Sequence, residues 1–138
     1  MNDIAVNIRN LRQQIPHSVK IVAVSKTKPV ASIMEAYNAG QRLFGENRVQ
    51  ELLRKKDQLP ADIAWHLIGH LQTNKVRSVV PFADMIQSVD SERLLEVINK
   101  EASKIDRIVD CLLQIYIADE ETKYGFSPDE AEAMRNSD

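Results

Sequence analysis

The chain has 138 residues, of which 43% are hydrophobic and 28% charged, and this composition is typical of a globular protein and excludes a disordered one. Its 18 basic and 20 acidic residues give a net charge of −2, so no strong field favours nucleic acid or an anionic membrane as a partner. The single cysteine, Cys111, cannot form an internal disulfide, and no stretch approaches the ~20 apolar residues of a membrane span. We therefore expect a cytoplasmic protein that acts on small molecules.

Hydrophobic periodicity predicts an opening helix and then alternating strands and helices. Apolar residues recur at helical spacing over residues 2–14, and the apolar run over residues 20–24 predicts a buried strand. Pro29 marks the start of a second helix, which ends at Gly40. After a short strand over residues 42–44, the turn is expected to lead into a third helix that Asn47 caps.

The pattern continues to the end of the chain. Strands are predicted over residues 64–68, 84–89 and 108–117, with helices after the third and from Ser91 after the fourth. The last strand is almost continuously apolar, which is typical of a strand covered on both faces. Residues 118–126 are predicted to form a loop. Ser127, Pro128 and Glu130 then form a capping-box pattern that predicts a final helix.

Five strands that alternate with helices predict a parallel sheet of class α/β. An open, doubly wound sheet suits 138 residues, whereas a closed eight-stranded barrel typically needs ~250. Length alone favours the open sheet. However, the glycine-rich phosphate loop that usually follows its first strand is absent, because residues 25–29 (SKTKP) contain no glycine.

Lys26 is the residue at which the sequence first suggests chemistry. If strand alternation continues past residue 24, its side chain points to the same side as Val22 and Val24, at the rim of an apolar interior. Desolvation lowers the pKa of a lysine, and a neutral amine attacks aldehydes. Lys28 has the same parity but precedes Pro29 and belongs to the connecting loop. The alternative, which spacing alone favours, is that both are ordinary surface lysines.

Other polar residues follow the predicted strands, at the edge where parallel α/β folds bind ligands. They are Glu46, Asn47, His66, His70, Gln87, Ser88 and Lys123. A strand end and a glycine turn separate His66 from His70, so a metal site is not expected, and a structural or pocket-lining role fits better. Glu46 and Asn47 are expected either to contact a ligand or to cap and charge the next helix.

Five motifs in the same order make this sequence similar to a known family. They are VAVSKTKP at 22–29, FGENRVQE at 44–51, WHLIGHLQTNK at 65–75, QSVDS at 87–91 and EETKYGF at 120–126. Together they resemble the pyridoxal phosphate homeostasis proteins, also called the YggS or PROSC family. The resemblance implies a β/α barrel of the alanine racemase amino-terminal type, here only its first five β/α units.

The resemblance also implies a site and a function. Lys26 would hold pyridoxal 5′-phosphate (PLP) as an internal aldimine at the barrel mouth, Asn47 would lie in that pocket, and His66 and Gln87 are further candidates. Family members are regarded as proteins of vitamin B6 homeostasis without established catalysis, and PLP-dependent apo-enzymes are their expected partners. A PLP- or Schiff-base-dependent enzyme such as an amino-acid racemase is the alternative, and it would need an acid or base across the pocket.

The sequence departs from this family near its carboxyl end. The family's later strands, which grip the cofactor phosphate, have no counterpart before Asp138, and Tyr116 stands where an asparagine is expected. We therefore expect residues 1–138 to form a single partial barrel domain with weakened phosphate binding. The open edges of its first and fifth strands predict self-association.

Overall fold

The computed structural model describes residues 3–117 and 125–137, so the motif at 120–126 and Lys123 fall largely or wholly outside the described residues. The described part contains the predicted alternation of helices and strands. The elements are α1 (Ile4–Gln14), β1 (Ala23–Val24), α2 (Val30–Asn38), β2 (Leu43–Glu46), α3 (Val49–Lys56), β3 (Ala64–Leu67), the 3₁₀ turn η1 (Thr73–Lys75), α4 (Val76–Val79), β4 (Ala83–Val89), α5 (Glu92–Lys104), β5 (Asp110–Leu113) and α6 (Pro128–Arg135).

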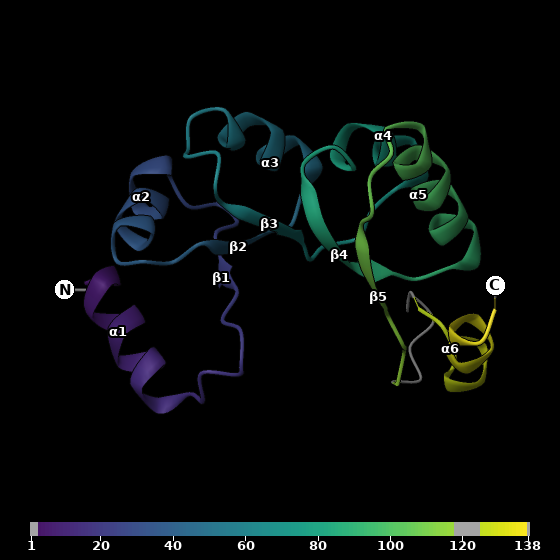
Figure 1. Cartoon of the computed structure of the whole chain (residues 1–138), viewed down its shortest axis with the longest axis horizontal. Coiled ribbons are helices and arrows are strands. Elements are labelled where there is room, and N and C mark those ends of the chain that lie inside the picture. Colours follow the sequence, from purple (N-terminus) through teal and green to yellow (C-terminus); the bar gives the residue numbers. More distant parts are fainter. Residues whose placement is uncertain (1–2, 118–124, 138) are drawn as a thin grey trace.

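The five strands are parallel and lie side by side in chain order, β1-β2-β3-β4-β5. A doubly wound sheet would break this order at the point where the chain reverses across the sheet. Winding in one direction with right-handed crossovers instead places the connecting helices on one side. Figure 1 shows α2, α3, α4 and α5 along one side of the curved sheet. The prediction of consecutive β/α units of a barrel is therefore confirmed, and the open doubly wound sheet is wrong.

The hydrophobic core lies between the sheet and these helices. Alternate strand residues point into it, because successive side chains of a strand point to opposite faces. Large side chains that are fully buried there include Phe44, Leu52, Leu67, Ile86 and Leu94. Each such side chain contributes about 1.5–3 kcal/mol to stability relative to an exposed one.

The opposite side of the sheet carries the residues between these core positions, and we call it the open face. The strand register aligns Val24 with Gly45, Gly45 with His66, His66 with Met85, and Met85 with Asp110. These five residues form one row across the open face. The row runs from the end of β1 to the start of β5, a stagger that is characteristic of barrel strands.

Two sequence predictions about strand ends are wrong. β2 continues to Glu46, and Arg48 is the residue that precedes the first turn of α3, so Asn47 does not cap that helix. β5 is shorter than predicted and is not covered on both faces: Ile108 and Ile117 beside it are 92% and 96% exposed. Leu112 and Ile115 are also 48% and 44% exposed, so this apolar run is not covered on both faces.

The predicted start signals of α5 and α6 are confirmed. Ser91 caps α5 by accepting a hydrogen bond from the Leu94 N–H at 3.1 Å. At the start of α6, Ser127 and Glu130 exchange side-chain and backbone hydrogen bonds, both of 3.2 Å, as a capping box requires. None of the helices in the described ranges is long and apolar enough to cross a membrane.

Candidate functional site

Lys26 lies in a tight turn directly after β1. The Lys28 N–H donates to the Ser25 carbonyl at 3.1 Å, which closes the turn over Lys26 and Thr27. Thr27 has a φ of 63°, in the left-handed region that β-branched residues rarely adopt. Because such a conformation costs about 1–3 kcal/mol, the surrounding structure has to hold it in place.

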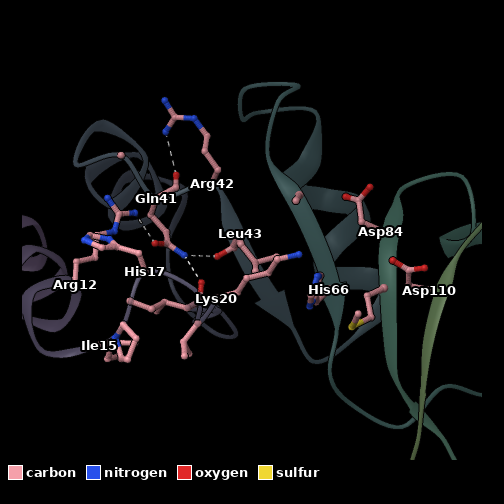
Figure 2. Close-up of a pocket in the computed structure, with 16 residues that line it drawn as sticks. Arg12, Ile15, His17, Lys20, Gln41, Arg42, Leu43, His66, Asp84 and Asp110 are labelled. Carbon is pink, nitrogen blue, oxygen red and sulfur yellow. Dashed lines mark hydrogen bonds between the residues drawn. The ribbon is translucent and has the colours of Figure 1, made fainter.

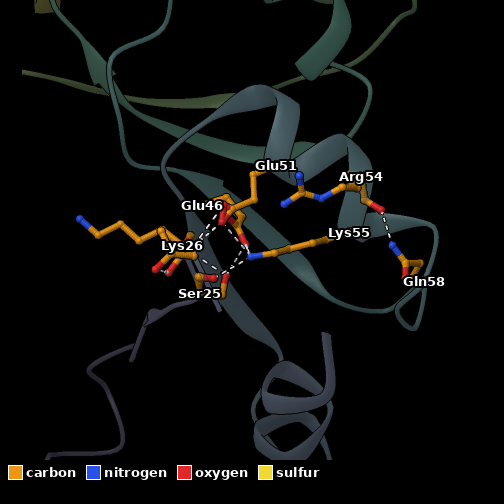
Figure 3. Close-up of polar contacts among 9 residues, drawn as sticks. Ser25, Lys26, Glu46, Glu51, Arg54, Lys55 and Gln58 are labelled. Carbon is orange, nitrogen blue, oxygen red and sulfur yellow. Dashed lines mark hydrogen bonds and ion pairs between the residues drawn. The ribbon is translucent and has the colours of Figure 1, made fainter. Parts of the chain in front are cut away.

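Four side chains under this turn supply that support, and we call Ser25, Glu46, Glu51 and Lys55 the turn cluster (Figure 3). The Lys55 ammonium donates to Glu46 Oε1 at 2.7 Å and to Glu51 Oε1 at 3.1 Å. It also donates to the Ser25 carbonyl at 2.8 Å, while Ser25 Oγ donates to Glu46 Oε1 at 2.8 Å. The Thr27 N–H donates to both carboxylate oxygens of Glu51, at 3.2 Å to Oε2. The turn is thus tied to β2 and α3.

The turn cluster is buried, which makes its charges interdependent. The side chains of Glu46 and Lys55 are 0% and 4% exposed, and that of Glu51 is 12% exposed. Burial alone would raise the pKa of Glu51, but the hydrogen bond from Thr27 and the ion pair with Lys55 hold it below its ordinary value. A carboxylate with a lowered pKa stabilises the fold at neutral pH, and this stabilisation is lost as the pH falls through its folded pKa.

Sequence reasoning missed the turn cluster because it assigned Glu46 to a helix start. Two signals could have found it. Glu46 is two residues from the buried Phe44, so both point to the helix-covered side of β2. Lys55 is three residues from Leu52, on the buried stripe of α3. A carboxylate and an ammonium that both face a core predict a buried ion pair.

Lys26 itself is exposed and points away from the turn cluster in Figure 3. The expectation that it lies beside an apolar wall is wrong, because Val24, on the same side of β1, is itself 52% exposed. The amine of Lys26 is therefore accessible to a small molecule.

Asn47 lies at the same end of the open face as Lys26. Val24 is aligned with Gly45, and Lys26 and Asn47 each follow two residues later on neighbouring chain segments. Asn47 packs against Gly69: a Cβ on Gly69 would lie 2.3 Å from both the carbonyl oxygen and Oδ1 of Asn47. Only glycine leaves room for Asn47 at this position.

His66 and Gln87 pair with each other on the open face. Gln87 Nε2 lies 2.8 Å from His66 Nδ1, and because an amide nitrogen donates, the neutral ring carries its proton on Nε2. Burial lowers the pKa of His66, Lys20 adds to this effect, and Asp84 and Asp110 oppose it. This pairing fits the structural role that the sequence allowed for His66.

The lowered pKa of His66 predicts a specific pH dependence of stability. Because the unfolded chain takes up the proton first, at a pKa near 6.5, the free energy of unfolding is expected to decrease as the pH falls from ~7.5 to ~5.5. The decrease should be smaller in His66→Gln, which lacks the ring. Urea unfolding of both proteins at both pH values measures the difference. Equal pH dependences of the two proteins would contradict the prediction.

A cavity lies at the other end of the strands from Lys26 (Figure 2). It has a volume of about 630 Å³ and is lined by residues at the strand starts, with His66 at its inner edge. One wall is structural: Arg12 donates to Gln41 Oε1 at 2.9 Å, and Gln41 Nε2 donates to the carbonyls of Ile21 and Leu43, each at 2.7 Å. These bonds tie α1 to the sheet. In β/α barrels the chemistry occurs at the carboxyl ends of the strands, so Lys26 and Asn47 lie at the preferred end.

His70, the other histidine near a strand end, lies with Nδ1 2.9 Å from Asp90 Oδ2. The part of the chain that the structure describes holds no group of three histidine, cysteine or carboxylate side chains placed to bind a metal ion. The candidate site therefore consists of Lys26 in its turn, Asn47 beside it, and the His66–Gln87 pair further along the open face.

Residues 1–137 match the family model described as alanine racemase, N-terminal domain. The chain belongs to this family. Curated relatives within it are named pyridoxal phosphate homeostasis protein: that of Pasteurella multocida is 38% identical over 137 residues, and that of Homo sapiens is 41% identical over 124 residues. The match covers 90% and 83% of this chain but only 59% and 45% of the two relatives. The similarity predicted from the five motifs is confirmed, over about half the length of these relatives.

Solved structures extend the comparison. PipY of Synechococcus elongatus, in a structure with PLP bound, is 44% identical and superposes with a TM-score of 0.88 over 96% of this chain and 62% of its own. Alanine racemase from E. faecalis superposes with a TM-score of 0.75 at 16% identity, over 96% of this chain and 37% of its own. The second likeness shows the fold alone.

Proposed function

We propose that this chain binds PLP covalently through Lys26 and acts in vitamin B6 homeostasis as a cofactor-holding protein. The observation that carries the proposal is the position of Lys26, an accessible amine in a firmly held turn at the carboxyl end of β1. It is supported by the 44% identity to PipY, whose structure contains PLP.

The residues at this end of the open face suit the cofactor. PLP supplies an aldehyde, which a neutral amine attacks to form a reversible C=N bond with loss of water. Lys26 offers the amine on the open side of β1, and Asn47 offers amide hydrogen-bonding groups on the adjacent segment. His66 and Gln87 satisfy each other by their hydrogen bond, and we assign them a supporting role.

The reversible bond also suggests a partner class. A C=N bond to one lysine exchanges for a bond to another without redox change, so we propose PLP-dependent apo-enzymes as recipients of the cofactor. The lone half-buried thiol, Cys111, fits a reducing cytoplasm as the location.

The experiment that tests the function combines absorption and mass spectrometry. The protein is titrated with PLP, the visible band of the C=N bond is recorded, and borohydride is added to make the linkage permanent. Peptide mapping is expected to place one pyridoxyl phosphate group on the peptide that contains Lys26. Modification spread evenly over surface lysines would contradict the proposal.

We also propose self-association through the edges of the sheet. β1 and β5 each have one neighbour among the described strands, and the β5 region exposes Leu112 and Ile117 by 48% and 96%. Unpaired strand edges with apolar side chains favour association with another copy. Sedimentation velocity is expected to detect dimers or larger species, and Leu112→Lys should shift them toward monomer. A compact monomer at all concentrations would contradict this proposal.

A further inference from the structure

The backbone that carries Lys26 is held by a side chain from a different element. Thr27 follows Lys26 directly, and its N–H donates to both carboxylate oxygens of Glu51, in the first turn of α3. Glu51 is 24 residues further along the chain. The Lys28 N–H to Ser25 carbonyl bond at 3.1 Å closes the turn itself, and Thr27 Oγ1 donates to the Lys26 carbonyl at 2.6 Å.

The conformation of Thr27 shows why this support matters. At a φ of 63° its Cβ is crowded against its own backbone, so a free peptide of this sequence would seldom adopt the turn. An acceptor aimed at the Thr27 N–H selects this conformation over the extended alternatives. Because Lys26 precedes Thr27, the same selection sets the direction in which the Lys26 side chain leaves the sheet.

The position of the Glu51 carboxylate is itself fixed. Lys55, one helical turn later, binds Glu51 Oε1 at 3.1 Å and Glu46 Oε1 at 2.7 Å. Glu46 is fully buried at the end of β2, so this chain of contacts runs from the sheet to the turn. Glu51 therefore links α3 to the Lys26 turn, with its carboxylate held in place by Lys55.

We propose that Glu51 is a positioning residue for Lys26, which fixes the turn through the Thr27 N–H and so presents the amine to the aldehyde of PLP. The inference rests on the proposed function and deepens it. Preorganisation of a reacting group speeds bond formation and strengthens binding, because less freedom is lost when the bond forms.

The test compares Glu51→Ala with Glu51→Gln. Alanine removes the acceptor, so the rate of C=N bond formation and the affinity for PLP are each expected to fall on the order of tenfold or more. Glutamine keeps a carbonyl oxygen in the same place and should restore most of both. The visible circular dichroism of bound PLP, which reports a fixed orientation, should weaken in Glu51→Ala and recover in Glu51→Gln. Stopped-flow absorption gives the rates.

Glu92→Ala is the matched control, since Glu92 is also a first-turn glutamate, exposed on α5 and without contact to the turn. It should bind PLP like the unmodified protein. If the unmodified protein forms no C=N bond at Lys26, the proposed function fails. If it does, and Glu51→Ala matches it in rate, affinity and dichroism, only the positioning role is overturned.

A second variant covers the case in which Glu51→Ala does not fold. Glu51→Asp keeps a carboxylate beside Lys55, so the protein is expected to fold, but the shorter side chain draws the acceptor away from the Thr27 N–H. Visible dichroism and the rate of bond formation should both decrease. Values equal to those of the unmodified protein in folded Glu51→Asp would overturn the inference.

Discussion

Lys26→Ala is expected to abolish the visible band of the C=N bond and to lower the affinity for PLP on the order of a hundredfold, because no amine at this position remains to attack the aldehyde. Because the Lys26 side chain is exposed, the free energy of unfolding should change by no more than about 0.5 kcal/mol, so a folding defect does not account for the loss. Absorption spectra during a PLP titration, with urea unfolding of the same samples, measure both quantities.

Lys28→Ala is the control for this experiment. Lys28 is also exposed and lies two residues away in the same loop. It is the last residue of the turn, whereas Lys26 is one of the two residues that the turn encloses. The variant is expected to keep the band and the affinity. A band that persists in Lys26→Ala, or that disappears in Lys28→Ala alone, would reassign the reactive amine.

Lys55→Ala is expected to destabilise the protein by about 3–5 kcal/mol, because it leaves the buried Glu46 carboxylate without its cation. Glu46 is fully buried, and within the described ranges its Oε2 has no hydrogen-bond partner, so Oε1 carries all of its contacts. Removing Lys55 takes away the strongest of these, at 2.7 Å. Urea unfolding of the variant and the unmodified protein gives the difference.

Two comparisons distinguish the effect of burying an unpaired charge from the effect of losing an ion pair within a helix. Lys104→Ala removes a lysine that also pairs with a glutamate on its own helix, Glu101, but at the surface, and it should cost less than about 1 kcal/mol. The double variant Glu46→Leu with Lys55→Met removes both charges and should be more stable than Lys55→Ala alone. Equal losses in Lys55→Ala and Lys104→Ala would show that the buried pair contributes little.

The elements with local signals could be predicted from the sequence. Ser91 and Ser127 mark helix starts because a side-chain acceptor satisfies backbone donors within three residues, an interaction that depends only on neighbours in the chain. The order of the strands could not be predicted in this way. Sequential and doubly wound sheets have the same local periodicity, and only the direction of the crossovers distinguishes them.

The residues of the candidate site could also be predicted in part from the sequence. Strand parity and the family resemblance pointed to Lys26 and Asn47, and the structure places both at one end of the open face. The surroundings of Lys26 were predicted wrongly, because the exposure of Val24 depends on what covers the sheet rather than on the strand. The turn cluster was missed because Glu46 was assigned to a helix start, although Glu46 and Lys55 both face the core, and Ser25 joins them only through tertiary contacts.

The sequential strand order also affects how the molecule assembles. Each strand after the first pairs with the strand immediately before it in the chain, so every new pairing closes only one short helical connection. Low contact order of this kind is associated with rapid folding. During translation we therefore expect the sheet to form strand by strand from β1. Each new β/α unit would pair with the unit that was synthesised just before it.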